Sequence, residues 1–125
     1  MTQMVERDEA SRGLGIELIS AGDGKARVRM RVTAAMVNGH GTVHGGYVFL
    51  LADTAFACAC HSHGPVAAGA DISFVRPARA GDLLEASGEE RVTSGRSGID
   101  DVAVTRDGEV VAEFRGRSRM IGPPT

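Results

Sequence analysis

The stretch 47–60, YVFLLADTAFACAC, decides the fold of this 125-residue chain. Its length and composition predict a helix over about 45–61, ended by the Gly64-Pro65 pair. Apolar residues lie on nearly every side of this helix, so we expect it to be buried almost all round. Asp53 is the only side chain in this stretch that is charged at neutral pH. Other elements must therefore wrap the helix, and their order determines the architecture.

Strand patterns on both sides of the helix supply this wrapping. Residues 25–32, KARVRMRV, alternate strictly between basic and apolar side chains and predict a half-buried strand. A turn at Asp23-Gly24 joins it to an extended segment at 16–20. Residues 33–46 have no usable periodicity and are expected to form a loop. Further strands are predicted over residues 66–76, 83–92, 99–106 and 109–120.

This order, two strands, one long helix and four strands, is consistent with an antiparallel sheet wrapped around one central helix. At this length it predicts the hotdog architecture, an α+β fold. We expect one hotdog domain over residues 1–125, with an N-terminal lead-in at 1–12 that includes a short helical segment. One such sheet leaves apolar helix surface poorly covered and an edge strand open. We therefore expect dimerisation that continues the sheet.

Composition and charge argue against several classes of protein. Apolar residues make up 42% of the chain and the formal net charge is −2, so neither nucleic acid nor an anionic membrane is an expected partner. The longest apolar stretch has about 14 residues, too few to cross a bilayer about 30 Å thick. The first residues lack the basic-then-apolar profile of a signal peptide, so we expect a cytoplasmic location.

The two cysteines are predicted to be reduced and buried. Cys58 and Cys60 are two residues apart in a predicted helix, so their side chains diverge and cannot form a disulfide with each other. Together with His61 and His63 they form a tight cluster. A zinc site generally draws a second pair of ligands from farther along the chain, and the sequence has no further cysteine. We therefore expect no metal site.

The loop before the helix, 38–46 or NGHGTVHGG, precedes backbone amides that have no partner within a helix. Gly45 and Gly46 have no side chains to shield these amides, so a carbonyl oxygen could approach closely, as in an oxyanion hole. Alternatively, the glycines only permit a tight turn into the helix. His44 could donate a hydrogen bond or orient a water, and Asn38 could hold a water or polarise a carbonyl.

The carboxylate of Asp53 is the candidate catalytic group. Asp53 lies eight residues past Gly45, about 12 Å along the helix axis. It cannot easily reach a carbonyl bound at the start of its own helix, so a site that uses both would more naturally combine two subunits. Within one helix, the alternatives are a buried protonated Asp53 or a hydrogen bond to Thr54 or to a neighbouring strand.

The string NGHGTVHGGYVFLLADTAFA, residues 38–57, resembles the PaaI-type acyl-CoA thioesterases, a hotdog family linked to phenylacetate catabolism. The segments FVRPARAGD at 74–82 and SGRSG at 94–98 resemble the same family in the same order. The resemblance covers about residues 12–121. An acidic residue eight places after the first glycine of HGG is the most specific part of this pattern.

The resemblance implies that Asp53 acts as a general base on water or as a nucleophile. It also implies that the Gly45 amide polarises the thioester carbonyl, while His44 and Asn38 help to hold the carbonyl or the water. The family's sites lie at a dimer interface, so a homodimer is the expected minimal unit and a homotetramer the expected assembly. No cofactor is expected, because coenzyme A (CoA) is part of the substrate and leaves as a thiolate.

Residues expected to bind substrate or CoA lie in loops and at strand ends that resemble the family's CoA-contacting segments. They are Gly46, Arg76, Pro77, Ser94, Gly95 and Arg96, with Arg79 as a further cationic candidate. The basic rows at 27–31 and 115–119 are instead expected to be a solvated sheet face balanced by acids.

The leading interpretation is a thioesterase that hydrolyses (hydroxy)phenylacetyl-CoA, or a similar aryl or medium-chain acyl-CoA, to free acid and CoA. A hotdog enoyl-CoA hydratase or dehydratase would carry an Asp and a His about five residues apart, whereas His44 precedes Asp53 by nine. A non-catalytic acyl-CoA-binding hotdog protein would be expected to lose the acid, and Asp53 is present.

Overall fold

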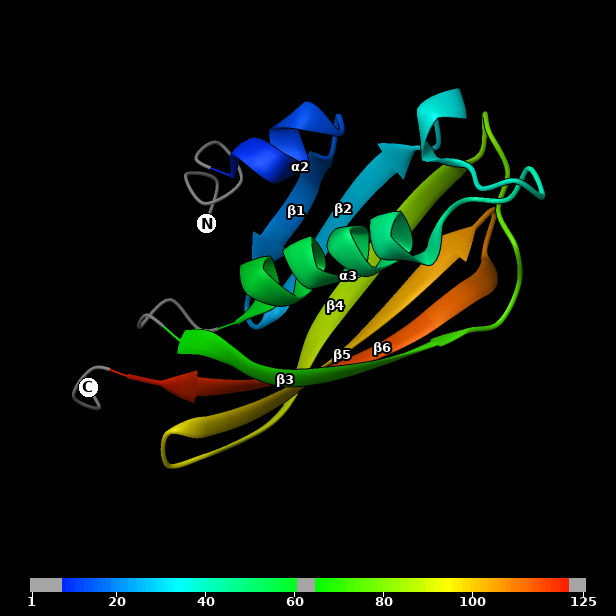
Figure 1. The fold of residues 1–125 in the computed structure, drawn as a ribbon. Helices are drawn as coiled ribbons and strands as arrows, with labels where there is room; N and C mark the ends of the chain where they lie inside the picture. Colours follow the sequence, from blue (N-terminus) through cyan, green and yellow to red (C-terminus); the bar gives the residue numbers. More distant parts are fainter. Residues whose placement is uncertain (1–7, 61–64, 122–125) are drawn as a thin grey trace.

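The long helix and the sheet are both present in the computed structural model, which describes residues 8–60 and 65–121. Two strands precede the long helix and four follow it, in the predicted order. The elements, labelled in Figure 1, are α2 (Glu9–Gly13), β1 (Glu17–Gly22), β2 (Lys25–Arg31), the 3-10 helix η1 (Ala34–Met36), α3 (Gly45–Ala59), β3 (Pro65–Phe74), β4 (Leu83–Ser94), β5 (Ser97–Arg106) and β6 (Glu109–Met120).

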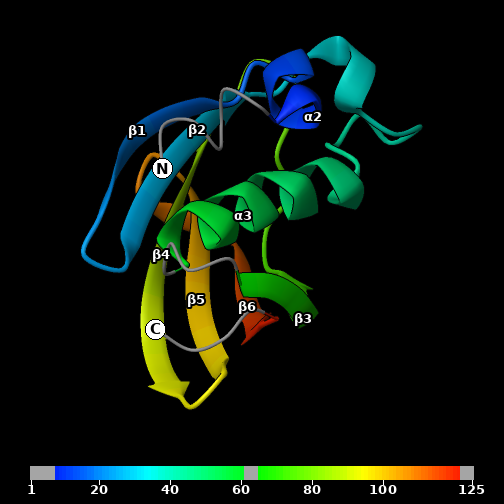
Figure 2. The same ribbon diagram turned by 90° about the vertical axis from the view of Figure 1, so that its left-hand side faces the viewer.

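The strands of the described chain form one six-stranded sheet in the order β1-β2-β4-β5-β6-β3, with every neighbouring pair antiparallel. The helix α3 lies across one face of this sheet (Figure 1), and the side view shows the strands curving around it (Figure 2). The α+β hotdog fold is thereby confirmed. The strands β1 and β3 form the two edges of the sheet.

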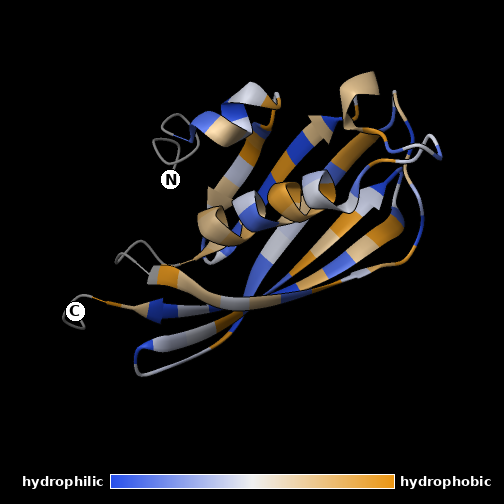
Figure 3. Cartoon of the chain, in the orientation of Figure 1, coloured by the Kyte–Doolittle hydropathy of each residue, from blue (hydrophilic) through white to orange (hydrophobic). Residues whose placement is uncertain are grey.

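Alternation along β2 shows how the sequence selects the face that meets the helix. Ala26, Val28 and Met30 are buried, whereas the basic residues between them are exposed, as predicted. The same alternation appears as hydrophobic and hydrophilic bands along the strand in Figure 3. Burying one face of each strand against α3 supplies the main stabilisation of such a fold, at roughly 25 cal/mol per Å² of apolar surface.

A glycine in β6 lets the helix approach the sheet closely. A Cβ at Gly116 would lie 2.7 Å from the ring of Phe56, which is 2% exposed, so no larger residue fits there without moving a buried ring. The ring of Phe56 also packs on Phe114, with ring centroids 5.7 Å apart. Phe56 is therefore a core residue.

Two local features differ from the expected pattern. The predicted loop at 33–46 contains one 3-10 turn, η1, which carries Met36 into the core. In the predicted strand at 109–120, strict alternation would place Val110 and Ala112 on one face, but the register shifts so that Val104 pairs with Ala112 and Thr105 with Val110. Both Val111 and Ala112 are consequently buried. A strict period of two cannot reveal such a bulge.

One face of α3 remains partly open, so the prediction of burial almost all round is wrong for a single chain. Gly46 and Phe49 are exposed on this face, and Asp53 and Ala57 farther along are only partly buried. The spacing of three to four residues places them on one side of the helix. The sheet and α2 cover the other sides, and no strand of the described residues lies over this one.

The cysteine prediction is confirmed in part. Cys58 and Cys60 are free and buried thiols, and burial together with the nearby charge of Asp100 raises the pKa of Cys60 to about 12. His61 and His63, which were considered with them as a metal cluster, lie outside the described residues. The helix α3 ends at Ala59 with Cys60 as its C-cap, about two residues before the predicted end. Within the described ranges, no helix is long and apolar enough to span a membrane.

A buried carboxyl lies at the far end of α3 from the glycine pair. Asp100 of β5 is 1% exposed and accepts a hydrogen bond from the thiol of Cys60, at 3.7 Å between Sγ and Oδ2. Burial, followed by the negative charge of Glu90, raises the pKa of Asp100 from 3.8 to about 6. The folded state therefore favours the protonated form of this side chain.

We expect Asp100→Asn to stabilise the protein at neutral pH. Because the folded-state pKa is raised, the favourable contribution of Asp100 to folding stability is complete below pH 3.8 and is lost as the pH rises to about 6. From pH 4 to pH 7, the free energy of unfolding of the variant should rise by about 1–2 kcal/mol relative to that of wild type, after discounting for solvent screening. Urea denaturation of both proteins at pH 4, 5 and 7 measures this difference. A difference that does not change with pH would contradict it.

Candidate active site

The loop before α3 is attached to the segment after β3 by backbone contacts. An isolated bridge pairs Thr42 with Arg79, and the N–H of Val43 donates to the carbonyl oxygen of Ala78 at 2.7 Å. A second bridge, between Val37 and Val43, closes the loop on itself. The glycine-rich motif and the FVRPARAGD motif, about 30 residues apart in sequence, therefore form one structural unit.

Asn38 organises this loop through its side-chain oxygen. Its Oδ1 accepts hydrogen bonds from the His40 N–H at 2.9 Å, the Thr42 N–H at 3.3 Å and the Thr42 hydroxyl at 3.2 Å. Its Nδ2 is the atom that it can offer to a bound carbonyl or water. The catalytic role suggested for Asn38 stays a prediction.

His44 is the N-cap residue of α3, so it controls the amides at the helix start. Its Nδ1 accepts from the N–H of Gly46 at a long 3.5 Å, and its carbonyl oxygen accepts from the N–H of Tyr47. Within the part of the chain that the structure describes, the N–H of Gly45 has no acceptor, as expected for the first residue of a helix. This amide is free to bind a ligand oxygen.

The lack of a side chain at Gly45 permits a close contact. A Cβ there would lie 2.8 Å from the tip of the Phe74 ring, at the end of β3. Gly46 is under no such constraint, since its added Cβ would meet only Nδ1 of His44, at 3.8 Å. Neither glycine has a positive φ. The first glycine is thus explained by the approach of another group to the helix start, and not by the turn alone.

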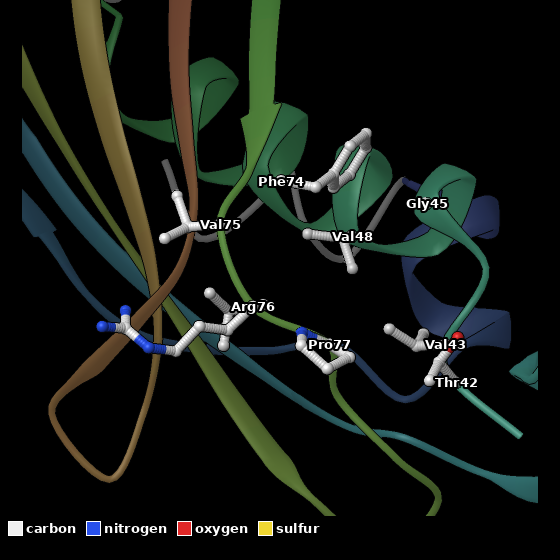
Figure 4. Close-up of a pocket in the computed structure, with 9 residues that line it drawn as sticks. Thr42, Val43, Gly45, Val48, Phe74, Val75, Arg76 and Pro77 are labelled. Atoms are coloured by element: carbon white, nitrogen blue, oxygen red, sulfur yellow. The ribbon is translucent and has the colours of Figure 1, made fainter.

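A cavity of about 400 Å³ opens beside Gly45, between the start of α3 and the segment after β3 (Figure 4). Apolar side chains make up most of its lining. The lining residues are Thr42, Val43, Gly45, Val48, Phe74, Val75, Arg76, Pro77 and Val111. Of the residues predicted to bind substrate, Arg76 and Pro77 therefore meet the predicted oxyanion donor, Gly45, at this cavity.

The guanidinium of Arg76 is directed away from Gly45 in Figure 4, toward the β5–β6 hairpin. Its Nη1 donates to the carbonyl oxygen of Val110 at 2.7 Å, and its Nε lies 3.6 Å from a carboxylate oxygen of Glu109. The side chain is 44% exposed, so it lies at the cavity rim and in contact with solvent. A bound phosphate would compete with Glu109 for it.

The hairpin at Ser94, Gly95 and Arg96 is not part of this cavity. Both ribbon views place the β4–β5 hairpin at the opposite end of the sheet from the loop before α3 (Figures 1 and 2). Within one chain, these three residues therefore do not join Gly45 or Arg76, and their role in binding CoA stays a prediction.

Four of the six arginines in the two basic rows on the outer sheet face are paired with acids, as predicted, whereas Arg31 donates to the carbonyl oxygen of Gly81 and Arg119 to the hydroxyl of Ser97. Arg27 bonds Glu85 and Arg115 bonds Asp101, each with a shortest N–O distance of 2.7 Å. Arg29 and Arg117 have similar partners in Glu17 and Asp71. Acids therefore offset the charge of these four arginines.

Asp53 lies on the open face of α3 and is partly buried. Burial, and to a smaller degree the negative charge of Asp8, raises the pKa of its carboxyl. Among the described residues, no donor hydrogen-bonds this carboxylate and no cation pairs with it. Thr54, one of its suggested partners, instead bonds the hydroxyl of Ser11 and the carbonyl oxygen of Leu50. A partly desolvated carboxylate of this kind is a stronger base than an ordinary aspartate.

Asp53 does not line the cavity that contains Gly45. The eight-residue separation along α3 places the two about 12 Å apart along the axis. One chain therefore presents a cavity with an oxyanion donor in one place and an unpartnered carboxylate in another. That a site using both groups would combine two subunits stays a prediction.

Several residues near these sites were not anticipated from the sequence. Val48, Val75 and Val111 line the cavity, but a valine in a core pattern carries no signal for a ligand. Ser11 is fully buried against Thr54, although the N-terminal lead-in was given no functional part. Its only signal is the N-cap pattern, since Asp8 lies three residues before it.

Comparison with known proteins places the chain in a family. The model of the thioesterase superfamily matches residues 40–113. The acyl-coenzyme A thioesterase PaaI of Escherichia coli (strain K12) is 47% identical over 122 residues, which cover 95% of this chain and 87% of that protein.

Solved structures agree with this match. The E. coli PaaI protein from the phenylacetic acid degradation operon superposes with a TM-score of 0.93 at 45% identity, covering 97% of this chain and 90% of that one. A hypothetical thioesterase from Streptococcus pneumoniae TIGR4, solved with coenzyme A, has a TM-score of 0.80 at 25% identity and covers 88% and 91%. The chain belongs to the thioesterase superfamily and, within its hotdog fold, to the PaaI-type acyl-CoA thioesterases.

Proposed function

We propose that the protein hydrolyses the thioester of (hydroxy)phenylacetyl-CoA, or of a similar aryl or medium-chain acyl-CoA, to the free acid and CoA. The observation that carries the proposal is the apolar cavity of about 400 Å³, which is lined in part by Gly45, whose N–H is free. An acyl group in this cavity would place its carbonyl oxygen at the start of α3, where the helix dipole favours negative charge.

The reaction then needs only groups that the chain supplies. The carboxylate of Asp53 takes a proton from water, and the water oxygen attacks the carbonyl carbon, or else the carboxylate attacks that carbon itself. The Gly45 amide donates to the oxyanion that forms, with His44 and Asn38 beside it. The intermediate expels CoA as a thiolate, a good leaving group that needs no strong acid. In the second route this leaves the acyl group joined to Asp53 as an anhydride, which water hydrolyses to the free acid and the carboxylate. No metal or cofactor enters the scheme, and chelation with EDTA should leave the rate unchanged.

The active site in this proposal combines two chains. The strand β3 is a sheet edge ten residues long, with Val66 and Phe74 44% and 55% exposed along it. The other edge, β1, has only six residues, and a short edge strand discourages pairing. A second copy added along β3 would continue the sheet and approach the open face of α3. Assembly of two such dimers into a tetramer belongs to the same proposal.

Mixed dimers test the two-chain site directly. We expect inactive Asp53→Asn and Gly45→Pro chains, refolded together, to recover about one quarter of wild-type activity. Random pairing makes about half of the dimers mixed, and each mixed dimer has one of its two sites intact. A site built within one chain would recover nothing. Light scattering on the same samples reports whether dimers or tetramers have formed.

The experiment that tests the function itself measures thiol release from a panel of aryl and aliphatic acyl-CoA esters. Turnover of an aryl-acyl ester that depends on Asp53 would support the proposal and rank the acyl groups. Binding of the esters without thiol release would contradict it and favour a non-catalytic acyl-CoA-binding protein.

A further inference from the structure

A buried polar chain links the N-terminal segment to the residue beside Asp53. Ser11 of α2 is fully buried and Thr54 of α3 is 5% exposed, and their hydroxyl oxygens lie 2.8 Å apart. The Ser11 hydroxyl also lies 2.6 Å from Oδ2 of Asp8, and the Ser11 N–H donates to Oδ1 at 3.0 Å. Three polar side chains thus connect two elements that are about 40 residues apart in sequence.

The protons of this chain have a defined direction. An ionised carboxylate only accepts hydrogen bonds, and each hydroxyl has one proton. Ser11 therefore donates to Asp8 and must accept from Thr54. The single hydroxyl proton of Thr54 is shared between Ser11 and the carbonyl oxygen of Leu50, which lies 3.0 Å from the Thr54 hydroxyl. A hydrogen bond of 2.6 Å to a carboxylate belongs to the strong, charge-assisted class. The chain consequently holds α2 against α3 one residue after Asp53.

The hydrogen bonds among Asp8, Ser11 and Thr54 also hold a second carboxylate, that of Asp8, near Asp53. The charge of Asp8 raises the pKa of Asp53, second only to burial. The strands that pack on α3 place small and apolar side chains against it, apart from Asp100 of β5 and Glu90 of β4, which act on Cys60 at the far end of the helix. The other titratable groups of α3 and its cap are His44, Tyr47, Cys58 and Cys60.

We propose that Asp8, Ser11 and Thr54 are positioning residues for Asp53, which hold the N-terminal segment, and with it the charge of Asp8, on α3. The inference rests on the proposed function, in which Asp53 is the base or nucleophile. A carboxylate with a higher proton affinity is the better base near neutral pH, which gives the arrangement a catalytic use.

Two substitutions separate the effect of the Asp8 charge from the effect of the hydrogen bond between Ser11 and Thr54. Asp8→Asn removes the charge but keeps an acceptor for Ser11, and Asn is as good an N-cap as Asp. The acid limb of its kcat/KM profile should move to lower pH, because the pKa of Asp53 falls. Ser11→Ala keeps the charge but cuts the link to Thr54, and kcat should fall about 10-fold. The matched control, Glu9→Gln, removes an exposed charge one residue away and should leave both quantities unchanged.

Carboxyl ¹³C NMR provides a readout that does not depend on turnover. The Asp53 signal, assigned by its loss in Asp53→Asn, is titrated in wild type, Asp8→Asn and Glu9→Gln. A lower Asp53 pKa in Asp8→Asn alone supports the proposal, even if no thioester is hydrolysed and the proposed function fails. Coincident titrations of wild type and Asp8→Asn, an equal shift in Glu9→Gln, or an unchanged kcat in an active Ser11→Ala would overturn it.

Discussion

Asp53→Asn is expected to lower kcat for acyl-CoA hydrolysis about 10³-fold, within the range that a positioned general base contributes. The substitution keeps the size of the side chain but removes the group that accepts a proton or attacks the carbonyl. The carboxylate has no partner among the described residues, and its pKa is already raised by burial, so its neutral replacement should not destabilise the fold. Steady-state thiol release, with a thermal melt of each protein, measures both effects.

A matched control distinguishes loss of the base from loss of charge. Asp23→Asn makes the same change in the exposed β1–β2 turn, where Asn tolerates the positive φ of 55°. This variant should retain wild-type kcat. An Asp53→Asn enzyme within about 10-fold of wild type would place the catalytic base elsewhere.

Gly45→Pro is expected to lower kcat about 10²-fold, because proline removes the N–H that would bind the oxyanion. Proline is well tolerated as the first residue of a helix, and the preceding residue, His44, already has the extended conformation that proline requires (φ −67°, ψ 133°). The loss should therefore appear in the chemistry and leave the helix intact. Kinetics with a saturating aryl-acyl-CoA and a circular dichroism spectrum check the two expectations.

Gly45→Ala separates the effect of losing the amide N–H from the effect of adding a Cβ. Both variants place a Cβ against the ring of Phe74, which is 55% exposed and has room to move. Only the proline removes the donor, so the alanine variant should stay within about 10-fold of wild type. Equal activity in the two variants would show that the Gly45 amide does not bind the transition state.

Local pattern was sufficient for the elements themselves. The strict alternation at 25–32 predicted β2 and its buried face, and the apolar run at 47–60 predicted α3. These predictions succeed because side-chain period and burial are coupled within a strand or helix. The bulge at Val111 and the turn η1 were not predicted, because each depends on how one segment packs against another.

The candidate site residues also divide into those that the sequence could identify and those that it could not. Asp53 and Gly45 could be selected from sequence, since a lone carboxylate in an apolar helix and a glycine pair at a helix start are local anomalies. That Phe74 approaches Gly45, and that Ser11 binds Thr54, could not be selected, because both pairs join residues distant in sequence. Nothing in the local composition around Ser11 distinguishes a buried hydroxyl from a solvated one.

The element order, the α+β hotdog fold and the family could all be predicted from the amino-acid sequence, because they depend on local periodicity and on contiguous motifs. Tertiary structure alone decided which residues share the cavity, which basic side chains are already paired, and that Asp53 lies outside the cavity that contains Gly45. The physical reason is distance. Eight residues of helix hold the two groups about 12 Å apart, and only packing between elements determines what fills that space.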